Sequence, residues 1–320
     1  MIRTSRATHQ KSKDRKTVIA MTNVDCIEPK FVFHSTHIIE HKEIAADTWQ
    51  LTFYAPDMAS RALPGQFFML RIAGQNDPLI GRALAMFDRR RDETGNLNAI
   101  SVVYTVKGRF TTAMARRNPG DQIEVWGPLG NAFSVEPVDH LILVAGGVGQ
   151  TPMLTYAAAA LGREEFGAPS SSIQNSSGSS SMKGPFASKV TMCYGARTKS
   201  QLAGVDQFEK VCSEVVITTE DGSAGIRGRV TTALEGILKR DQTKNCRIAC
   251  CGPEPMMHAV SKMAESYGIP CQVSLETPMA CGIGICFTCV AKVIQPDGQW
   301  DYKRTCIEGP IFDSKNICWE

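Results

Sequence analysis

No run of eighteen apolar residues occurs anywhere in the sequence, so we expect no transmembrane helix and no membrane insertion. The N-terminus also lacks the apolar core of a signal peptide, because VIAMTNV is short and ends in polar residues. Lysine and arginine gather on no periodic face, which argues against a nucleic-acid partner. Together, these absences predict a protein that stays in the cytoplasm.

Extremes of composition are absent as well. The 320 residues carry a formal net charge of +3 and are 43% hydrophobic, as in an ordinary soluble protein. This length favours about two domains, and the sequence contains no internal repeat. Its twelve cysteines, in a reducing compartment, indicate metal binding, catalysis or burial rather than a disulfide scaffold. Cys193, Cys250 and Cys251 stand in apolar runs, where a cysteine is more often a small core residue.

The first half of the chain has the pattern of a β-barrel. Residues 1–30 are polar and basic without periodicity, and we expect a disordered tail there. Residues 31–136 contain short β-type runs separated by turns such as Pro64-Gly65, at intervals typical of an antiparallel barrel. The runs are FVFHSTHIIEHKEI, TWQLTFYAP, GQFFMLRIA, LNAISVVYTV and DQIEVWGP. TTAMARR, after Gly108, is the one short helix expected in this region.

The pattern changes near Glu136–His140, and residues 137–270 alternate apolar strands with helices. LILVAGGVGQTPMLTYAAAALG has the pattern of a strand, a glycine-rich turn and a helix with Pro152 in its first turn. KVTMCYGAR, EVVITTEDG and RIACCGPEP are further buried strands. This α/β alternation predicts a doubly wound parallel sheet. Residues 167–185 are rich in serine and predict a flexible surface insertion, which a fold tolerates at low entropic cost.

Cysteine spacing organises the last segment, residues 271–320. Cys281, Cys286 and Cys289 follow the pattern C-x4-C-x2-C, and sixteen residues separate the third from Cys306. This spacing suits a plant-type [2Fe–2S] cluster, and the glycines of ACGIGIC let the backbone bend around the inorganic sulfurs. VAKVIQ, PDG and QWDYKR predict a hairpin that returns the fourth cysteine to the other three.

Two other interpretations compete with the cluster. A zinc site usually needs two separated C-x2-C pairs, and only one such pair occurs here. Disulfide bonds need an oxidising compartment, for which the sequence gives no sign. The cysteine pattern therefore favours the cluster.

Turns at strand ends are candidates for binding phosphate. Gly146–Gly149 lies where a strand meets a helix, and backbone N–H groups bind anions at such junctions, although three glycines can also serve packing alone. The turn does not continue as G-x-G-x-x-G. CGPEPM is a second junction at the same carboxyl edge of the sheet. In the barrel half, Arg82 offers a bidentate fork and Gly108–Thr111 opens a helix, but a lone arginine is by default a surface residue.

The order of these segments resembles the ferredoxin–NADP reductase superfamily: a barrel, GGVGQTP, CGPEPM and then the cysteine motif. Within it, SLETPMACGIGICFTC and DYKRTCIEGPIF resemble the electron-transfer subunits of two-subunit, NAD-linked dihydroorotate dehydrogenases. GPLGNAF and TEDGSAGIRG are similar to that family too. The similarity extends from about Phe31 to Trp319. It implies an FAD-binding barrel, an NAD-binding domain and a small C-terminal [2Fe–2S] segment.

The resemblance also assigns residues to each cofactor. Those implied for FAD are Arg82, Leu84 and Ala85 at the flavin, with Gly108 and Thr111 near its phosphates. Those implied for NAD are Gly147, Gly149, Cys251 and Gly252, and the implied cluster ligands are Cys281, Cys286, Cys289 and Cys306. The chain departs from the superfamily at Ala83 and Ala85, where Pro and Ser or Thr are common. Backbone groups must therefore replace a hydroxyl near the flavin ring.

The family implies an oxidoreductase subunit that acts in electron transport for pyrimidine biosynthesis. The FMN of a catalytic partner oxidises dihydroorotate to orotate, and electrons cross the cluster to FAD and then NAD+. Flavin is the necessary intermediary because nicotinamide exchanges a hydride and the cluster one electron at a time. The sequence has no recognisable site for dihydroorotate and needs no catalytic acid or base. The implied assembly is a heterotetramer of two heterodimers.

Three alternatives remain open from the sequence. A reductase of the same build can serve another acceptor, such as an oxygenase. A cluster or zinc protein that has lost its nucleotide sites would not be an enzyme. Arg197 and Lys199 follow the second strand of the α/β domain and can hold a 2′-phosphate, so the sequence alone does not decide between NAD and NADP.

Overall fold

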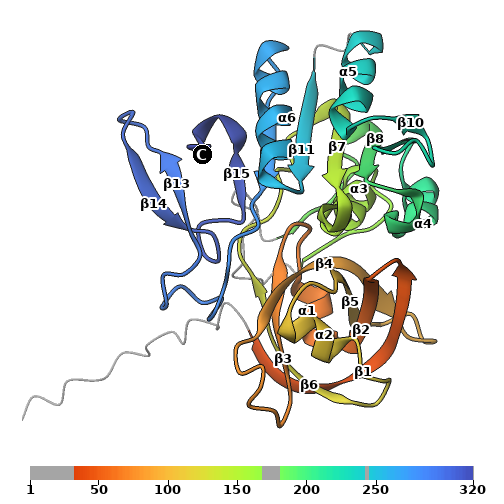
Figure 1. Ribbon diagram of the computed structural model, residues 1–320, viewed down its shortest axis with the longest axis vertical. Helices are drawn as coiled ribbons and strands as arrows, with labels where there is room; N and C mark the ends of the chain where they lie inside the picture. Colours follow the sequence, from red (N-terminus) through yellow and green to blue (C-terminus); the bar gives the residue numbers. More distant parts are fainter. Residues whose placement is uncertain (1–31, 168–180, 242–244, 320) are drawn as a thin grey trace, which may run out of the picture.

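The computed structural model describes residues 32–167, 181–241 and 245–319. Figure 1 shows a barrel at the bottom, a sheet flanked by helices above it, and a hairpin at one side. The tail expected at residues 1–30 lies outside the described residues, as do residues 168–180 of the serine-rich insertion. Among the described helices, none is long and apolar enough to cross a membrane.

Six antiparallel strands close the barrel in the order β1-β2-β5-β4-β3-β6, which confirms the expected architecture. The strands are β1 (Val32–Ala45), β2 (Thr48–Tyr54), β3 (Phe67–Ile72), β4 (Arg82–Arg91), β5 (Leu97–Thr105) and β6 (Gln122–Leu129). Alternation is clear on β1, where Thr36 and Ile38 are buried and His37 and Ile39 are exposed. This period of two places apolar side chains inside the barrel.

The barrel carries two short helices, α1 (Pro56–Arg61) and α2 (Arg109–Met114). The expectation of a single short helix in this region was therefore wrong. Each helix has only six residues. So short a segment shows too little of the helical period to be told from a turn in sequence.

The α/β part is a seven-stranded sheet in the order β10-β9-β8-β7-β11-β12-β15, as the doubly wound prediction requires. The strands are β7 (Val138–Gly146), β8 (Ala187–Ala196), β9 (Glu214–Thr219), β10 (Ile226–Arg227), β11 (Cys246–Cys251), β12 (Cys271–Ser274) and β15 (Ile311–Asp313). All neighbouring pairs are parallel except β12 and β15. The carboxyl ends of the parallel strands point toward the barrel, where ligands bind in such sheets.

Helices cover both faces of this sheet. One face is covered by α3 (Met153–Ala160), which also contacts β4 of the barrel, and by α4 (Val205–Val211). The other face is covered by α5 (Val230–Arg240) and α6 (Glu254–Ser266). Single 3₁₀ turns are η1 (Gly147–Gln150), η2 (Lys199–Gln201) and η3 (Ser314–Asn316). The core is continuous between the two parts: Phe133, after the barrel, stacks on Tyr156 of α3 with ring centroids 4.4 Å apart. The two parts therefore share one hydrophobic core.

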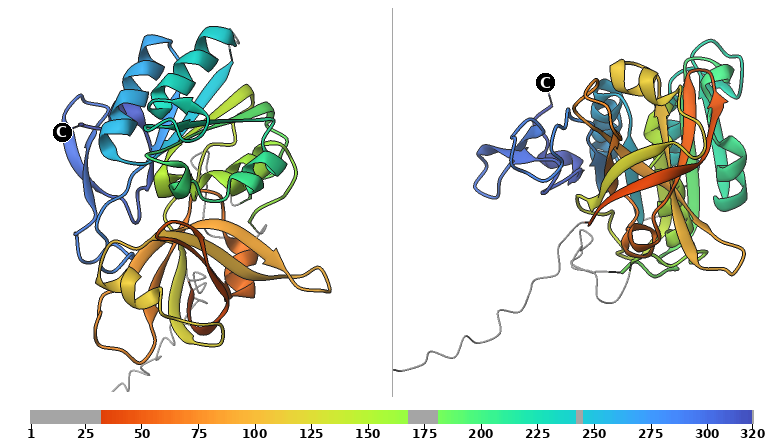
Figure 2. Two further views of the ribbon diagram at one scale, coloured as in Figure 1. Left: turned by 45° about the vertical axis from the view of Figure 1, so that its right-hand side comes forward. Right: turned by 90° about the horizontal axis from the view of Figure 1, so that it is seen from below.

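The C-terminal segment forms the predicted hairpin, from β13 (Val290–Ile294) and β14 (Trp300–Arg304). The hairpin projects from the side of the molecule in both Figure 1 and Figure 2. The segment then returns to the sheet as β15, and Asn131 fixes this return. The Asn131 side chain accepts a hydrogen bond from Ile311 N (2.9 Å) and donates to Ile311 O (2.9 Å). The segment is thus joined to both larger parts.

Candidate functional site

A cavity of about 470 Å³ opens between the barrel, η1 and the segment that follows β12. The residues implied for FAD all line it, namely Arg82, Leu84, Ala85, Gly108 and Thr111. Arg82 begins β4 and is exposed, and no hydrogen bond or ion pair engages its guanidinium within the described chain. The cavity therefore combines an apolar wall with an unpaired cation, which suits a flavin and its pyrophosphate.

Hydroxyl groups reach the flavin cavity from outside the expected motif. Ala83 and Ala85 supply none, but Thr105 at the end of β5 and Thr277 after β12 both line the cavity, and the Thr277 hydroxyl is hydrogen-bonded to the Thr305 hydroxyl. Thr111 is already engaged, because its Oγ1 accepts hydrogen bonds from Lys107 N (2.9 Å) and Gly108 N (3.0 Å). The side chain of Thr111 therefore shapes the turn before α2.

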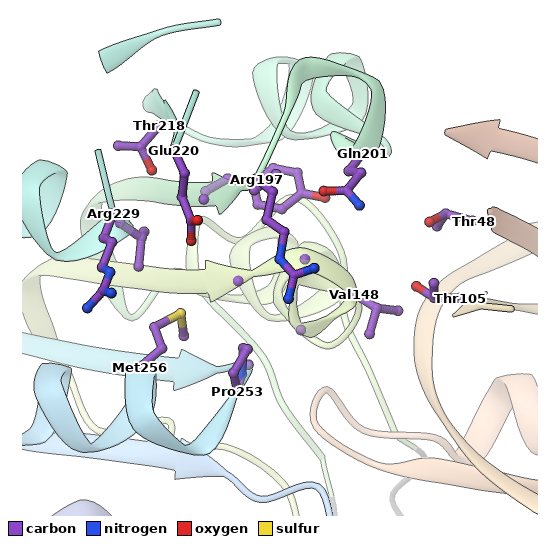
Figure 3. A pocket seen from close by; sticks show the side chains of 18 of the residues that line it. Thr48, Thr105, Val148, Arg197, Gln201, Thr218, Glu220, Arg229, Pro253 and Met256 are labelled. Atoms are coloured by element: carbon purple, nitrogen blue, oxygen red, sulfur yellow. The ribbon is translucent and has the colours of Figure 1, made fainter. Parts of the chain in front are cut away.

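A second cavity, of about 640 Å³, lies at the carboxyl ends of β7, β8, β9 and β11. Gly147, Gly149 and Gly252 line it, as expected for the residues implied at the nucleotide. Cys251 instead lines the flavin cavity. Figure 3 shows Arg197 and Glu220 extending into the nucleotide cavity, with Arg229 at its edge and Thr48 and Thr105 on the barrel side. Its concave, charged wall at the strand ends suits a dinucleotide.

The glycines of η1 and its flanks serve packing as well as binding. A Cβ at Gly149 would stand 2.3 Å from the Cys251 carbonyl oxygen, and one at Gly146 would stand 2.6 Å from Met256 Sδ. Those two glycines let the two turns touch. Gly147 differs, because its φ is +55° and a Cβ there would meet nothing within 4 Å. Of these three glycines, Gly147 is the one that faces open space with a backbone conformation that favours glycine.

The two cavities meet, and five residues line both of them. These are Thr105, Lys107, Val148, Gly149 and Glu276. Lys107 and Glu276 are the charged members of this set, and sequence analysis assigned neither of them a role. The signal for Glu276 was its place in SLETPMAC, directly before the cysteine motif. The junction is where two ligands, one in each cavity, would come into contact.

The four cysteines of the motif lie on the barrel beside β3 and β6. The Trp126 indole Nε1 donates to Cys281 O (2.9 Å), and the backbone N of Ile283 approaches Cys281 Sγ (3.4 Å). Gly282 has a φ of +71°, and a Cβ there would lie 2.5 Å from Met69 Cγ in the barrel. Glycine is therefore required for the loop to rest on the barrel with its N–H groups toward sulfur.

The thiols form two neighbouring pairs, Cys281 with Cys286 and Cys289 with Cys306. A hydrogen bond with the Thr288 side chain (3.1 Å) is the main reason that the pKa of Cys286 falls to about 6. Burial raises the pKa of Cys306 to about 12. One pair is thus near the surface and the other is covered.

The number of cysteines in the motif suits the predicted cluster. Each iron of a [2Fe–2S] cluster takes two cysteines, and the inorganic sulfides complete its coordination. The four motif cysteines supply that number of ligands.

The cluster site and the flavin cavity share buried apolar side chains. Phe67 and Met279 line the flavin cavity. The same two residues belong to a small hydrophobic core with Cys289 and Cys306. Phe67 and Met279 therefore connect the covered pair of thiols with the wall of the flavin cavity.

Three family profiles match the chain. The iron–sulfur cluster binding domain of dihydroorotate dehydrogenase B matches residues 276–318. An oxidoreductase NAD-binding domain matches residues 143–262, and an oxidoreductase FAD-binding domain matches residues 35–133. The matches confirm the three cofactors expected from the sequence.

Curated relatives of nearly the same length are similar to the chain. The dihydroorotate dehydrogenase B (NAD+) electron transfer subunit of Desulforamulus reducens is 33% identical over 278 residues, which cover 87% of this chain and 95% of the relative. The subunit of the same name from Geobacillus kaustophilus is 31% identical, with 88% and 96% covered.

Solved structures share the fold. A structure of NADH-dependent reduced ferredoxin–NADP oxidoreductase, described for flavin-based electron bifurcation, superposes with a TM-score of 0.69 at 29% identity. The match covers 89% of this chain and 90% of that one. Phthalate dioxygenase reductase, at 17% identity and a TM-score of 0.54, shares the fold alone.

Proposed function

The chain belongs to the family of dihydroorotate dehydrogenase B (NAD+) electron-transfer subunits, and from this premise we propose the reaction that it serves. It takes electrons from the FMN of a catalytic partner that oxidises dihydroorotate to orotate, and it delivers them through [2Fe–2S] and FAD to NAD+ in pyrimidine biosynthesis. Flavin, when bound, exchanges a hydride with nicotinamide and single electrons with the cluster. The observation that carries the proposal is the shared apolar core between the cluster thiols and the flavin cavity.

Each cofactor has a proposed set of ligands. For the cluster, Cys281 and Cys286 hold one iron, and Cys289 and Cys306 hold the other. The proposed FAD contacts are Arg82, Leu84, Ala85, Gly108 and Thr111, and the proposed NAD contacts are Gly147, Gly149 and Gly252 with Cys251 beside them. Arg82 places its free guanidinium on the flavin pyrophosphate. Met279 and Phe67 exclude water between cluster and flavin, because both are almost fully buried.

The edge of the cluster loop has the character of a protein-docking surface. Ile285 and Phe287 flank Cys286 and are 74% and 63% exposed, and Ile307 is 46% exposed. Exposed apolar patches of this kind mark interaction sites. Trp300 and Tyr302 on the hairpin are exposed aromatic side chains as well. A catalytic partner that covers this face brings its own cofactor toward the surface pair of thiols.

Three finer points of the proposal concern nucleotide, assembly and compartment. NAD is favoured over NADP because Glu220 extends into the nucleotide cavity beside Arg197, and its carboxylate would repel a 2′-phosphate. Lys199 is not among the residues that line that cavity. The assembly is a heterotetramer of two heterodimers. The proposed compartment is the cytoplasm.

Reconstitution with an FMN-containing dihydroorotate dehydrogenase catalytic subunit tests the function. Alone, the chain is expected to reduce an artificial one-electron acceptor with NADH and to leave dihydroorotate unchanged. The mixture should elute as one complex and form orotate with NAD+ as oxidant, followed by size-exclusion chromatography and orotate absorbance. If the isolated chain oxidises dihydroorotate, the proposed division of labour is wrong.

A surface variant sharpens the same experiment. Ile285→Glu should weaken the complex about tenfold or more while leaving NADH-driven reduction of the artificial acceptor intact, because it places a charge on the docking face. Ile226→Glu is the matched control, since Ile226 is 45% exposed on β10 at the opposite edge of the sheet. Equal complex formation by both variants would place the partner elsewhere.

A second candidate function is a reductase that serves a different acceptor. The observation that favours it is the 29% identity to the NADH-dependent reduced ferredoxin–NADP oxidoreductase structure over 90% of that chain. The second function is supported if no complex or orotate forms with the catalytic subunit while a ferredoxin or an oxygenase accepts electrons from the chain.

A further inference from the structure

Two threonine hydroxyls connect the wall of the flavin cavity with the cluster loop. Thr277 follows β12 and lines the flavin cavity, and its hydroxyl is hydrogen-bonded to that of Thr305. Thr305 lies between β14 and Cys306 and is fully buried. Its hydroxyl donates to the backbone carbonyl of Cys289 (3.1 Å). The two side chains therefore form a hydrogen-bonded chain from the cavity wall to a residue of the covered thiol pair.

The backbone at this place does not depend on these hydroxyls. The Cys289 carbonyl already accepts a hydrogen bond from Thr305 N (2.8 Å), so the Thr305 hydroxyl adds a second donor to the same oxygen. Replacing both partners of a buried hydrogen bond with apolar groups of the same shape is often nearly neutral for stability. Two valines would therefore pack here about as well as two threonines. The presence of two hydroxyls points to a role beyond stability.

The number of protons fixes the order of donors in this chain. Each hydroxyl carries one hydrogen, and that of Thr305 is directed to the Cys289 carbonyl. The Thr277 hydroxyl therefore donates to Thr305 Oγ1. The connection consists of two hydrogen bonds and the covalent bonds of Cys289 from its carbonyl to Sγ. An electron tunnels more readily through such bonds than across the van der Waals gaps between packed apolar side chains.

We propose that the Thr277–Thr305 hydroxyl pair couples the cluster to the flavin for electron transfer. This inference rests on the proposed function for the direction in which electrons flow. Each electron that passes oxidises one ferrous iron of the cluster to the ferric state and reduces the flavin by one electron. Two such electrons and one proton from solvent give the flavin the hydride that NAD+ then takes. Thr305 acts through Cys289 and Thr277 and is therefore a positioning residue.

The test uses the full chain loaded with FAD and the cluster, without a catalytic partner. Flash photolysis of a deazaflavin delivers one electron to the oxidised chain, and absorbance follows the passage of that electron between flavin and cluster. Thr305→Val removes the hydroxyl but keeps the backbone hydrogen bond to Cys289. This variant should slow the passage severalfold. Reduction of the flavin by NADH, followed by stopped-flow absorbance, should keep its wild-type rate.

Further variants separate the bonded route from other effects of substitution. Thr305→Ser keeps the hydroxyl and should retain the wild-type rate of passage. Thr277→Val should slow the passage as much as Thr305→Val does, and the double variant should be no slower, because both residues lie on one route. Thr52→Val is the matched control, since Thr52 is also fully buried and its hydroxyl is hydrogen-bonded to that of Ser101 (2.8 Å). Neither of these two residues lines a cofactor cavity, and the rate should not change.

Iron and acid-labile sulfide content, FAD affinity and the midpoint potential of the cluster should match the wild type in every valine variant. The proposal is overturned by an unchanged rate in Thr305→Val, by a serine variant as slow as the valine variant, or by additive effects in the double variant. A shift in midpoint potential that accounts for the slower passage also overturns it. Should Thr305→Val fail to assemble the cluster, Thr277→Val decides the same question, because Thr277 is only partly buried. The measurement does not involve orotate formation, so its failure is distinct from failure of the proposed function.

Discussion

The guanidinium of Arg82 lies in the wall of the flavin cavity at the start of β4, unpaired within the described chain. Arg82→Ala is expected to weaken FAD affinity roughly 10- to 150-fold, because a charged hydrogen bond contributes about 1.5–3 kcal/mol. Titration of the apoprotein with FAD, followed by flavin fluorescence, measures the FAD affinity of the variant. The control is Arg91→Ala at the other end of β4, where Arg91 donates to the Gly95 carbonyl. Wild-type flavin affinity in Arg82→Ala would remove Arg82 from the site.

A motif was enough to bring single residues to a cavity wall. Arg82 and Gly147 belong to recognisable segments and line the flavin and nucleotide cavities, and their contacts with the cofactors stay a prediction. Lys107 belongs to no motif and Glu276 lies at the edge of SLETPMAC, and a lone charged residue is by default solvated, so only the folded chain brings the two together. Cys251 was assigned to the nucleotide but lines the flavin cavity, while Gly252 lines the nucleotide cavity. Successive residues at a strand end face opposite sides, which a motif alone does not resolve.

The loop that carries the first three cysteines is the element whose shape depends most on glycine. Gly282→Ala should lose most of the cluster, because its Cβ would stand 2.5 Å from Met69 Cγ and 3.0 Å from Leu129 Cδ1, and both side chains are buried. Iron and acid-labile sulfide per chain, with the low-temperature EPR signal, measure the loss.

Gly298→Ala in the hairpin turn is the matched control for that loop. Gly298 has a φ of +82°, similar to the +71° of Gly282, but a Cβ there would meet nothing within 4 Å. The Gly298→Ala substitution therefore introduces about 1 kcal/mol of backbone strain without a steric clash, and this variant should keep the cluster. If both variants keep it equally, the packing of the loop on the barrel does not matter for assembly.

Elements were predictable in proportion to their length and regularity. The five barrel runs, the apolar strands of the sheet and the β13–β14 hairpin appear where their patterns placed them, but the barrel strand β4 (Arg82–Arg91) was not predicted. The short helix α1 was missed, and β15 has only three residues. A strand of that length has no periodicity of its own. Its position depends on pairing with β12 and on the Asn131 side chain, both distant in sequence.

At the scale of the whole molecule, the cluster segment completes the other two parts. It adds β15 to the edge of the sheet and places Thr277, Pro278, Met279 and Pro310 in the wall of the flavin cavity. The sequence indicated three consecutive units: the barrel, the α/β domain and the cluster segment. In the folded chain these units depend on one another, because the flavin cavity is lined by residues of all three.

This interdependence predicts different results for two ways of removing the cluster. Deleting residues 276–320 should abolish FAD retention and lower the melting temperature, because the deletion opens the flavin cavity and exposes the sheet edge at β12. Replacing Cys281, Cys286, Cys289 and Cys306 with serine should instead remove iron while FAD remains bound, because the chain path and β15 are kept. Flavin absorbance after gel filtration, iron content and thermal melts distinguish the two variants. If the truncated chain holds FAD as tightly as the serine variant, the segment is an independent module and the barrel with the sheet is sufficient for flavin binding.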